Sequence, residues 1–325
     1  MPTLTRREQT SRPTATRSRQ GVTMNLRILL ALSLILPTTA ALAAEGTFDK
    51  TLTIAGAPSV SVSTGSGYIH IYPGSNNQVH IIGHVHANPN WFGSNADARV
   101  KEIVDSPPIV QSGNTITVSA PHADSDLFRN ISIDYDVTTP ADTTLKAHTG
   151  SGSMEIGGIQ GTVTASSGSG SIHIDNIGPA PRIETGSGRI QATNVHGAAF
   201  VQTGSGSIEL SLAAPGDVTA HTGSGSIRID GVSGPLRATT GSGSIQAAGN
   251  PTSEWRAETG SGSIRLQLAP DARFNLAASS GSGSIHADRP IVMQGDLNRH
   301  HITGTVNGGG PTVRASSGSG SITIR

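Results

Sequence analysis

The chain of 325 residues has no cysteine, few aromatic residues and little charge. Without cysteine it has no disulfide framework, no thiol nucleophile and no thiolate ligands for zinc or an iron–sulfur cluster. Aromatic residues make up 3% of the chain and charged residues 14%. The low aromatic share excludes the aromatic-rich core of an ordinary enzyme of this length. The low charged share argues against a disordered tail, which is typically rich in charge. Glycine is abundant, with 41 residues, so we expect a repetitive fold that buries small side chains.

The first 43 residues have the layout of a secretory signal peptide. Arg27 precedes an apolar run over residues 28–36, and Ala41-Leu42-Ala43 places small residues two apart, as at a cleavage site. The run is too short for a membrane-spanning helix. We predict that translation starts at Met24 and that cleavage near Ala43 exports a chain without a transmembrane span to the periplasm, the outer surface or the medium.

Removal of this leader changes the charge balance. Residues 1–43 hold six arginines and one glutamate, so the exported chain keeps 16 basic and 21 acidic side chains, a net charge of −5. No lysine and arginine cluster remains of the kind that neutralises phosphates. The sequence therefore argues against nucleic acid as a partner.

A motif of Gly-Ser-Gly, then Ser, Arg or Tyr, then Ile or Met occurs ten times. Apolar and polar residues alternate before it, as in Val163-Thr164-Ala165, and after it, as in Ile172-His173-Ile174. Alternation with a period of two indicates a half-buried strand on each side of a corner. The first glycines of the motifs are at positions 65, 150, 168, 186, 204, 223, 241, 260, 281 and 318.

A unit of this length cannot bury its apolar side alone, so the units must stack, with backbones about 4.8 Å apart. We predict an all-β fold, a single-stranded β-helix (β-solenoid) of 18–19-residue coils. Its glycines would form the corners through positive φ and close backbone approach. The Thr or Ser before each first glycine would form a ladder of hydroxyl groups. In the outward column that follows each Ile, Glu209 would lie beside Arg228, and no like charges would adjoin.

The spacing of the motifs also predicts the domain organisation. Residues 44–140 would form N-terminal coils and a small cap with one short helix over residues 95–105, and residues 141–325 would form the solenoid. The 37-residue interval after position 281 would hold one degenerate coil around residues 303–310.

Two stretches carry a family resemblance: ISIDYDVTTP at residues 131–140, and LKAHTGSGSMEI at residues 145–156 with the repeats that follow it. Over most of residues 50–325 the chain resembles the bacterial DUF4097 family of adhesin-like proteins. The resemblance implies a right-handed β-helix on an exported protein and supplies no catalytic residues. Members of that family often have Asp where this chain has Ser171, Arg189 or Ser207.

Metal and cofactor sites have little support in the sequence. His84 and His86 share a strand face and could ligate zinc or copper. We interpret them, with His80, as exposed strand histidines, because no acidic residue lies in the same strand. The adjacent His300 and His301 would point to opposite faces. Calcium-binding repeats need Asp two residues after the last glycine, where this chain has Ile or Met. We predict no metal and no cofactor.

Catalysis is also disfavoured, because the acidic residues are scattered one per coil. Glu184 and Glu258 share a column but would lie four coils apart, about 19 Å, beyond the carboxylate pairs of glycosidases. We predict a non-catalytic surface or envelope protein, adhesive or structural, with a cell-surface glycan or protein as partner. The alternative is a polysaccharide-active β-helix enzyme, a lyase or hydrolase. An ice-binding face is disfavoured because apolar residues stand two positions before each Thr of the ladder.

Binding specificity is expected in the segments that break the period. Residues 87–96 include Trp91-Phe92, which we interpret as a cover for an apolar end of the solenoid. Residues 289–310 form the longer break, and we predict that a partner would contact them. The candidate contact residues are Arg289, Asp296, Arg299, His300 and His301.

Overall fold

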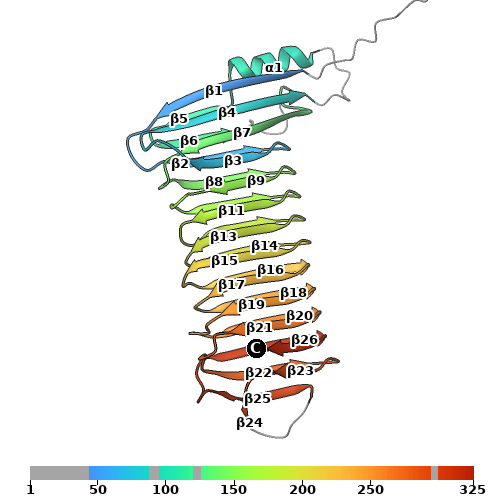
Figure 1. Ribbon diagram of the computed structural model, residues 1–325. Coiled ribbons are helices and arrows are strands. Elements are labelled where there is room, and N and C mark those ends of the chain that lie inside the picture. Colours follow the sequence, from blue (N-terminus) through green and yellow to red (C-terminus); the bar gives the residue numbers. More distant parts are fainter. Residues whose placement is uncertain (1–43, 88–94, 120–125, 294–298) are drawn as a thin grey trace, which may run out of the picture. The chain divides into compact units, whose positions relative to one another are not determined.

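The computed structural model describes residues 44–87, 95–119, 126–293 and 299–325, which belong to one compact unit, Ala41–Arg325. The leader, Trp91-Phe92 and Asp296 lie outside the described residues. In the described part the strands form two sheets with a common apolar core, and each repeat coil gives one strand to each sheet (Figure 1). The predicted β-solenoid is confirmed.

The 13-stranded sheet contains the strands that follow the corners. In spatial order its strands are β1 (Glu45–Thr53), β4 (Gln78–Ala87), β7 (Ile131–Thr139), β3 (Ile69–Pro73), β9 (Met154–Gly157), β11 (Ile172–Ile177), β13 (Ile190–His196), β15 (Ile208–Ala214), β17 (Ile227–Val232), β19 (Ile245–Gly249), β21 (Ile264–Leu268), β27 (Ile322–Ile324) and β23 (Ile285–Ala287).

The 14-stranded sheet contains the strands that precede the corners. In spatial order its strands are β24 (Val292–Met293), β25 (His301–Val306), β22 (Phe274–Ser280), β26 (Thr312–Ser319), β20 (Trp255–Ser261), β18 (Leu236–Ser242), β16 (Val218–Ser224), β14 (Ala199–Thr203), β12 (Arg182–Thr185), β10 (Val163–Ser167), β8 (Thr144–Thr149), β2 (Ser59–Thr64), β6 (Thr115–Ser119) and β5 (Ile109–Ser112).

The hydroxyl ladder is confirmed at all ten corners. Each Thr or Ser before the first glycine is buried and donates a hydrogen bond to a backbone carbonyl. The acceptor is the second glycine of the neighbouring corner, except that Thr64 donates to Ile133 O of β7. For example, Thr185 Oγ1 donates to Gly170 O at 2.9 Å, and Thr203 Oγ1 to Gly188 O at 3.1 Å. The donors are Thr64, Thr149, Ser167, Thr185, Thr203, Thr222, Thr240, Thr259, Ser280 and Ser317.

Glycine is required at the corners chiefly because neighbouring backbones approach closely. A Cβ atom on Gly170 would lie 1.7 Å from the carbonyl oxygen of Gly152. Positive φ, which the sequence led us to expect throughout, occurs among the corner glycines only at Gly243, Gly262 and Gly320. The corners are otherwise built without left-handed backbone, so steric contact between coils explains the pattern.

The predicted helix is confirmed as α1 (Ala96–Asp105), which packs on β1 and β4 at the N-terminal end of the 13-stranded sheet. Its buried residues Val100 and Ile103 face the core. There β1, β4 and β7 pair antiparallel, and the parallel pairing begins between β7 and β3. The described residues contain no helix long and apolar enough to span a membrane.

A single-stranded β-helix implies that the coils stack in chain order. The C-terminal coil does not, so the prediction is wrong for this coil. Strand β26 lies between β20 and β22, and β27 lies between β21 and β23. Figure 1 accordingly shows the C-terminus within the stack. Residues 303–310 are no degenerate coil: β25 pairs antiparallel with β22 and β24, and the chain then returns through Asn307, Gly308 and Gly309, all with positive φ.

The reason lies in the similarity of the coils. Val313 and Ala315 are buried at the places that Trp255 and Ala257 take in the adjacent strand. Because every coil carries this pattern, the pattern specifies that coils stack but not which coil lies next to which.

Candidate functional site

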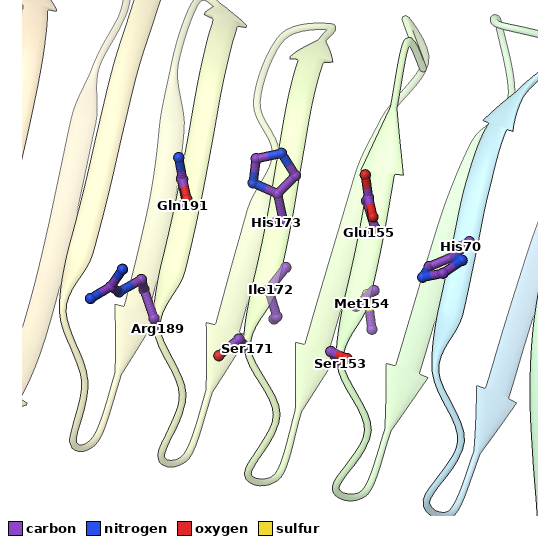
Figure 2. A pocket seen from close by; sticks show the side chains of 9 residues that line it. All are labelled: His70, Ser153, Met154, Glu155, Ser171, Ile172, His173, Arg189 and Gln191. Atoms are coloured by element: carbon purple, nitrogen blue, oxygen red, sulfur yellow. The ribbon is translucent and has the colours of Figure 1, made fainter.

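A shallow hollow of about 160 Å³ lies on the outer face of the 13-stranded sheet. The parallel register aligns equivalent outward positions of successive strands, so His70, Glu155, His173 and Gln191 form one row across β3, β9, β11 and β13. Figure 2 shows this row, with Glu155 between the two histidines. The row offers donors and acceptors on planar side chains at the spacing of the strands.

A second row lies nearer the corners. Ser153, Ser171 and Arg189 each follow a second corner glycine and line the same hollow (Figure 2). Beneath them, Met154 and Ile172 are almost fully buried and belong to the core. Ser171 and Arg189 place a hydroxyl group and a cation in this row.

A second hollow, of about 140 Å³, lies next to the first along the sheet and shares Gln191 with it. Glu209 and Arg228 are register partners here, as predicted. Arg228 Nε donates to Asp230 Oδ2 at 2.9 Å. We call the two hollows together the outer groove; it runs from His70 to Asp230.

Beyond the N-terminal end of the groove, the three histidines of β4 have acidic partners that lie on other strands. His84 Nε2 lies 3.3 Å from Asp136 Oδ2, and His86 Nε2 lies 3.3 Å from Asp134 Oδ2. The sequence showed no acid within β4, and the acids come from β7 through antiparallel pairing. His80 contacts Asp49 of β1 at 2.7 Å. These histidines are therefore members of a histidine–carboxylate cluster.

Tyr68 and His70 join this cluster to the outer groove. Their rings stack with centroids 4.2 Å apart. Tyr68 Oη donates to Asp136 Oδ2 at 3.1 Å, and the Tyr68 amide donates to Asp134 Oδ1 at 2.8 Å. Burial, with help from the bond to Asp136, raises the pKa of Tyr68 to about 12. Within the part of the chain that the structure describes, no group of three His, Asp or Glu side chains could hold a metal ion.

The described candidate contact residues of the long break are Arg289, Arg299, His300 and His301. The Arg289 guanidinium donates to the carbonyls of Leu268 and Ala269, so it anchors its own segment. Arg299 and His300 are exposed, and His301 Nε2 lies 3.0 Å from Thr303 Oγ1. Contact with a partner here stays a prediction.

The outer face of the 14-stranded sheet carries an arginine row that sequence reasoning missed. Arg237, Arg256 and Arg314 are register partners on β18, β20 and β26. Glu258 accepts from Arg256 at 2.7 Å and Glu254 from Arg314 at 3.2 Å. The sequence could show the neighbours Arg237 and Arg256 of successive coils, but not Arg314, which the inserted C-terminal coil brings next to Arg256.

The three aromatic residues of the described coils in residues 141–325 provide no sugar-stacking platform. Phe274 is buried in the core. Trp255 is buried, and its Nε1 donates to Gly234 O at 3.0 Å. The half-exposed ring of Phe200 is covered by the guanidinium of Arg182 at 4.1 Å.

Fold and groove define a repeat protein of the β-solenoid class. The family described as Toastrack DUF4097 matches residues 105–325, which is more than half of the chain, so the protein belongs to the DUF4097 family. The resemblance inferred from the repeats is confirmed. No curated protein matches the chain.

Two solved structures are similar to the chain at low identity. One is a putative cell adhesion protein from Clostridium sporogenes, with 12% identity, a TM-score of 0.23, and coverage of 86% of this chain and 99% of the other. The second is a putative adhesin from Bacteroides fragilis, with 13% identity, a TM-score of 0.40, and coverage of 86% and 97%.

Proposed function

We propose that the protein is an exported, non-catalytic binding protein of the cell envelope that holds an extended glycan in the outer groove. The observation that carries the proposal is the continuity of the two hollows through Gln191. Their polar rows repeat with the strand spacing, about 4.8 Å. Such a surface presents hydrogen-bonding groups at regular intervals, which suits a polymer of regular repeats. Export is supported by the leader sequence.

The character of the surface favours a glycan over a protein partner. Protein interfaces have apolar centres rich in aromatic residues. Among the described residues the large apolar side chains that are exposed are Tyr72, Val110 and Val292, and they lie on three different strands. The groove is instead open, and most of the residues that line it carry a polar or charged group.

The placement of the carboxylates supports a binding role over hydrolysis. Glu155 and Glu209 lie in one row but three strands apart, about 14 Å. Asp230 lies on the strand next to Glu209, and its carboxylate is held in an ion pair by Arg228, whose Nε donates to Asp230 Oδ2 at 2.9 Å. Glycosidases use carboxyl pairs about 5–9.5 Å apart. Turnover of a bound polysaccharide by the purified protein would instead favour the alternative, a polysaccharide-active enzyme.

A glycan array probed with the exported chain tests the proposal, followed by titration of each hit. Gln191→Ala and His173→Ala should each weaken binding about fivefold, the loss of one or two hydrogen bonds. The matched controls Gln202→Ala and His221→Ala alter the other sheet and should leave the affinity unchanged. If the groove variants and the control variants weaken binding equally, the outer groove is not the binding site.

The same titration tests the contact segment predicted from the sequence. Replacement of residues 299–301 by Gly-Ser-Gly should leave glycan affinity unchanged if the groove is the site. If this replacement abolishes binding while the groove variants bind normally, the partner contacts the segment, and the groove proposal fails.

A further inference from the structure

An exposed tyrosine stands beside the outer groove, on the strand that contributes His70. Tyr72 is 40% exposed, the most of any aromatic residue in the part of the chain that the structure describes. It follows His70 by two positions in β3, so both side chains lie on the outer face of the sheet. Tyr72 therefore offers an accessible aromatic surface next to the polar rows of the groove.

The Tyr72 ring has room beside β9 because that strand has a glycine at the adjoining position. The Cβ atom that Gly157 lacks would lie 3.2 Å from both Cδ1 and Cε1 of the ring. The register partner of Gly157 on β11 is Asp175, and that of Asp175 on β13 is Thr193. A side chain of that size at position 157 would push the ring from its place. Glycine here therefore lets the tyrosine lean over β9.

The Tyr72 hydroxyl is hydrogen-bonded to Glu155, which lines the first hollow. Burial, with help from this bond, raises the pKa of Tyr72 to about 12, so the hydroxyl stays protonated and donates to the carboxylate. Because the bond holds the ring in place, a ligand that packs on it orders less side-chain motion. An ionised carboxylate has about four acceptor positions, so Glu155 can also accept hydrogen bonds from a ligand.

The charges that line the groove favour an uncharged ligand. They are three carboxylates and two guanidinium groups, and the two signs are interspersed along the sheet: Glu155, Arg189, Glu209, Arg228 and Asp230. A polymer with a charge on every sugar would lie against groups of its own sign, whichever sign it carries. The hydroxyl groups of a neutral sugar can instead donate to the carboxylates and accept from the guanidinium groups.

We propose that the ligand of the outer groove is an uncharged glycan of hexopyranose units, one ring of which packs on Tyr72 and donates a hydroxyl hydrogen bond to Glu155. This inference rests on the proposed function and adds the class of sugar and the residue that selects it. A pyranose ring has an apolar face of C–H groups and a rim of hydroxyl groups. An exposed aromatic ring with a carboxylate beside it matches both.

A glycan array that carries cellohexaose, laminarihexaose, mannohexaose and hexagalacturonate tests the ligand class. The exported chain should bind at least one of the three neutral hexasaccharides and should not bind the acidic hexagalacturonate. If it binds only hexagalacturonate, the proposed function stands and this inference fails. If it binds no glycan on the array, the proposed function fails as well.

Variants at the tyrosine test the contact by titration with the neutral hexasaccharide that binds. Tyr72→Ala should raise the Kd about tenfold, because the aromatic surface is lost. Tyr72→Phe keeps the ring and should stay within about threefold of the wild type. Gly157→Thr introduces the side chain that β13 has at this position, and should raise the Kd about threefold to tenfold by displacing the ring. The control Phe200→Ala removes a ring from the other sheet and should leave the Kd unchanged.

Glu155→Gln keeps the size of the side chain and removes its charge, and should weaken the neutral glycan about threefold. Tighter binding by this variant would mean an anionic ligand and would overturn the proposal. So would a Tyr72→Ala variant, folded by circular dichroism, that binds as tightly as Phe200→Ala. Should Tyr72→Ala fail to fold, Gly157→Thr decides: wild-type affinity in that variant excludes the ring as a contact.

Discussion

The repeat coils and the strands at the ends of the stack pair their backbones in opposite ways. From β8 to β21 the neighbouring strands run parallel, and the two strands of each coil are joined by a corner of glycine and serine. At the ends, β7, β4 and β1 on one side and β25 and β24 on the other run antiparallel. Antiparallel strands need only a short turn, whereas a parallel neighbour needs a further crossover. The irregular segments therefore determine where the stack stops.

The two regions also differ in the side chains that they can hold. In the coils, backbone contact at the corners leaves room only for glycine. Besides the hydroxyl ladder, the inner faces of β8–β21 carry Ala, Val, Ile, Leu and Met154, and Trp255 is their one aromatic residue. At the N-terminal end the neighbours are not identical coils, and Phe48, Tyr135 and the histidine–carboxylate cluster lie there. Larger and more reactive groups thus gather where the repeat stops.

The position of the C-terminal coil provides the sharpest test of this comparison. Ser316 is the register partner of both Glu258 and Ser279, so Glu258 and Ser279 are two strands apart, about 10 Å. A disulfide needs Cα atoms about 4.4–6.8 Å apart. The natural chain has no cysteine, so two cysteines can be introduced as a pair. The double variant Glu258→Cys with Ser316→Cys should form an intramolecular disulfide almost completely on oxidation. The double variant Glu258→Cys with Ser279→Cys should not. Mass spectrometry after proteolysis reads the result, and the reverse pattern would mean stacking in chain order.

A single methyl group at a corner should have the next largest effect. In Gly170→Ala the new Cβ would lie 1.7 Å from Gly152 O, so two coils must separate. We expect a loss of about 3 kcal/mol or more in the free energy of unfolding, measured by urea denaturation followed by circular dichroism. Gly65→Ala, at the end of the stack, should be nearly neutral. Equal losses in the two variants would show that close approach does not explain the glycines.

The hydroxyl ladder should contribute less at each position. Thr203→Val keeps the shape of the side chain and removes the donor to Gly188 O. We expect a loss of about 1 kcal/mol, visible in the same urea curves. The control Thr219→Val changes a half-exposed position of the neighbouring strand and should lose less. If both variants unfold alike, the buried hydroxyls fill space without stabilising the corners.

Much of this fold could be predicted from the sequence, because the repeat fixes local geometry. The register of Glu209 with Arg228 and the hydroxyl ladder follow from a pattern that recurs every coil. The helix follows from a separate stretch, residues 95–105. The inserted coil could not be predicted, since Val313 and Ala315 fit beside any other coil. The partners of His84 and His86 were also hidden, because antiparallel pairing with β7 joins residues 50 positions apart in the chain. The similarity of the coils and the long-range pairing thus limit what can be predicted of this fold from its sequence.

The smallest predicted effect concerns Asp175 of β11, whose side chain joins two coils through bonds to β13. Its Oδ1 accepts from Thr193 Oγ1 at 2.5 Å and from Asn194 Nδ2 at 3.0 Å. The bond from Thr193, assisted by that from Asn194, lowers the pKa of Asp175 below its ordinary value. A carboxyl whose pKa is lower in the folded state stabilises the fold above its unfolded pKa, near 3.9. That contribution is lost as the pH falls through the lower, folded pKa.

The variant Asp175→Asn should therefore melt about 1–2 °C below the wild type at pH 7. The difference should shrink as the pH falls below 4, because the wild-type carboxyl then takes up its proton. Asp217→Asn, at an exposed position without a hydrogen bond to its carboxylate in the described residues, is the matched control and should follow the wild type at every pH. Melting curves from pH 7 to pH 3 measure both. If Asp175→Asn keeps the same difference down to pH 3, the carboxylate charge does not stabilise this turn, and Asp175 acts only through the shape of its side chain.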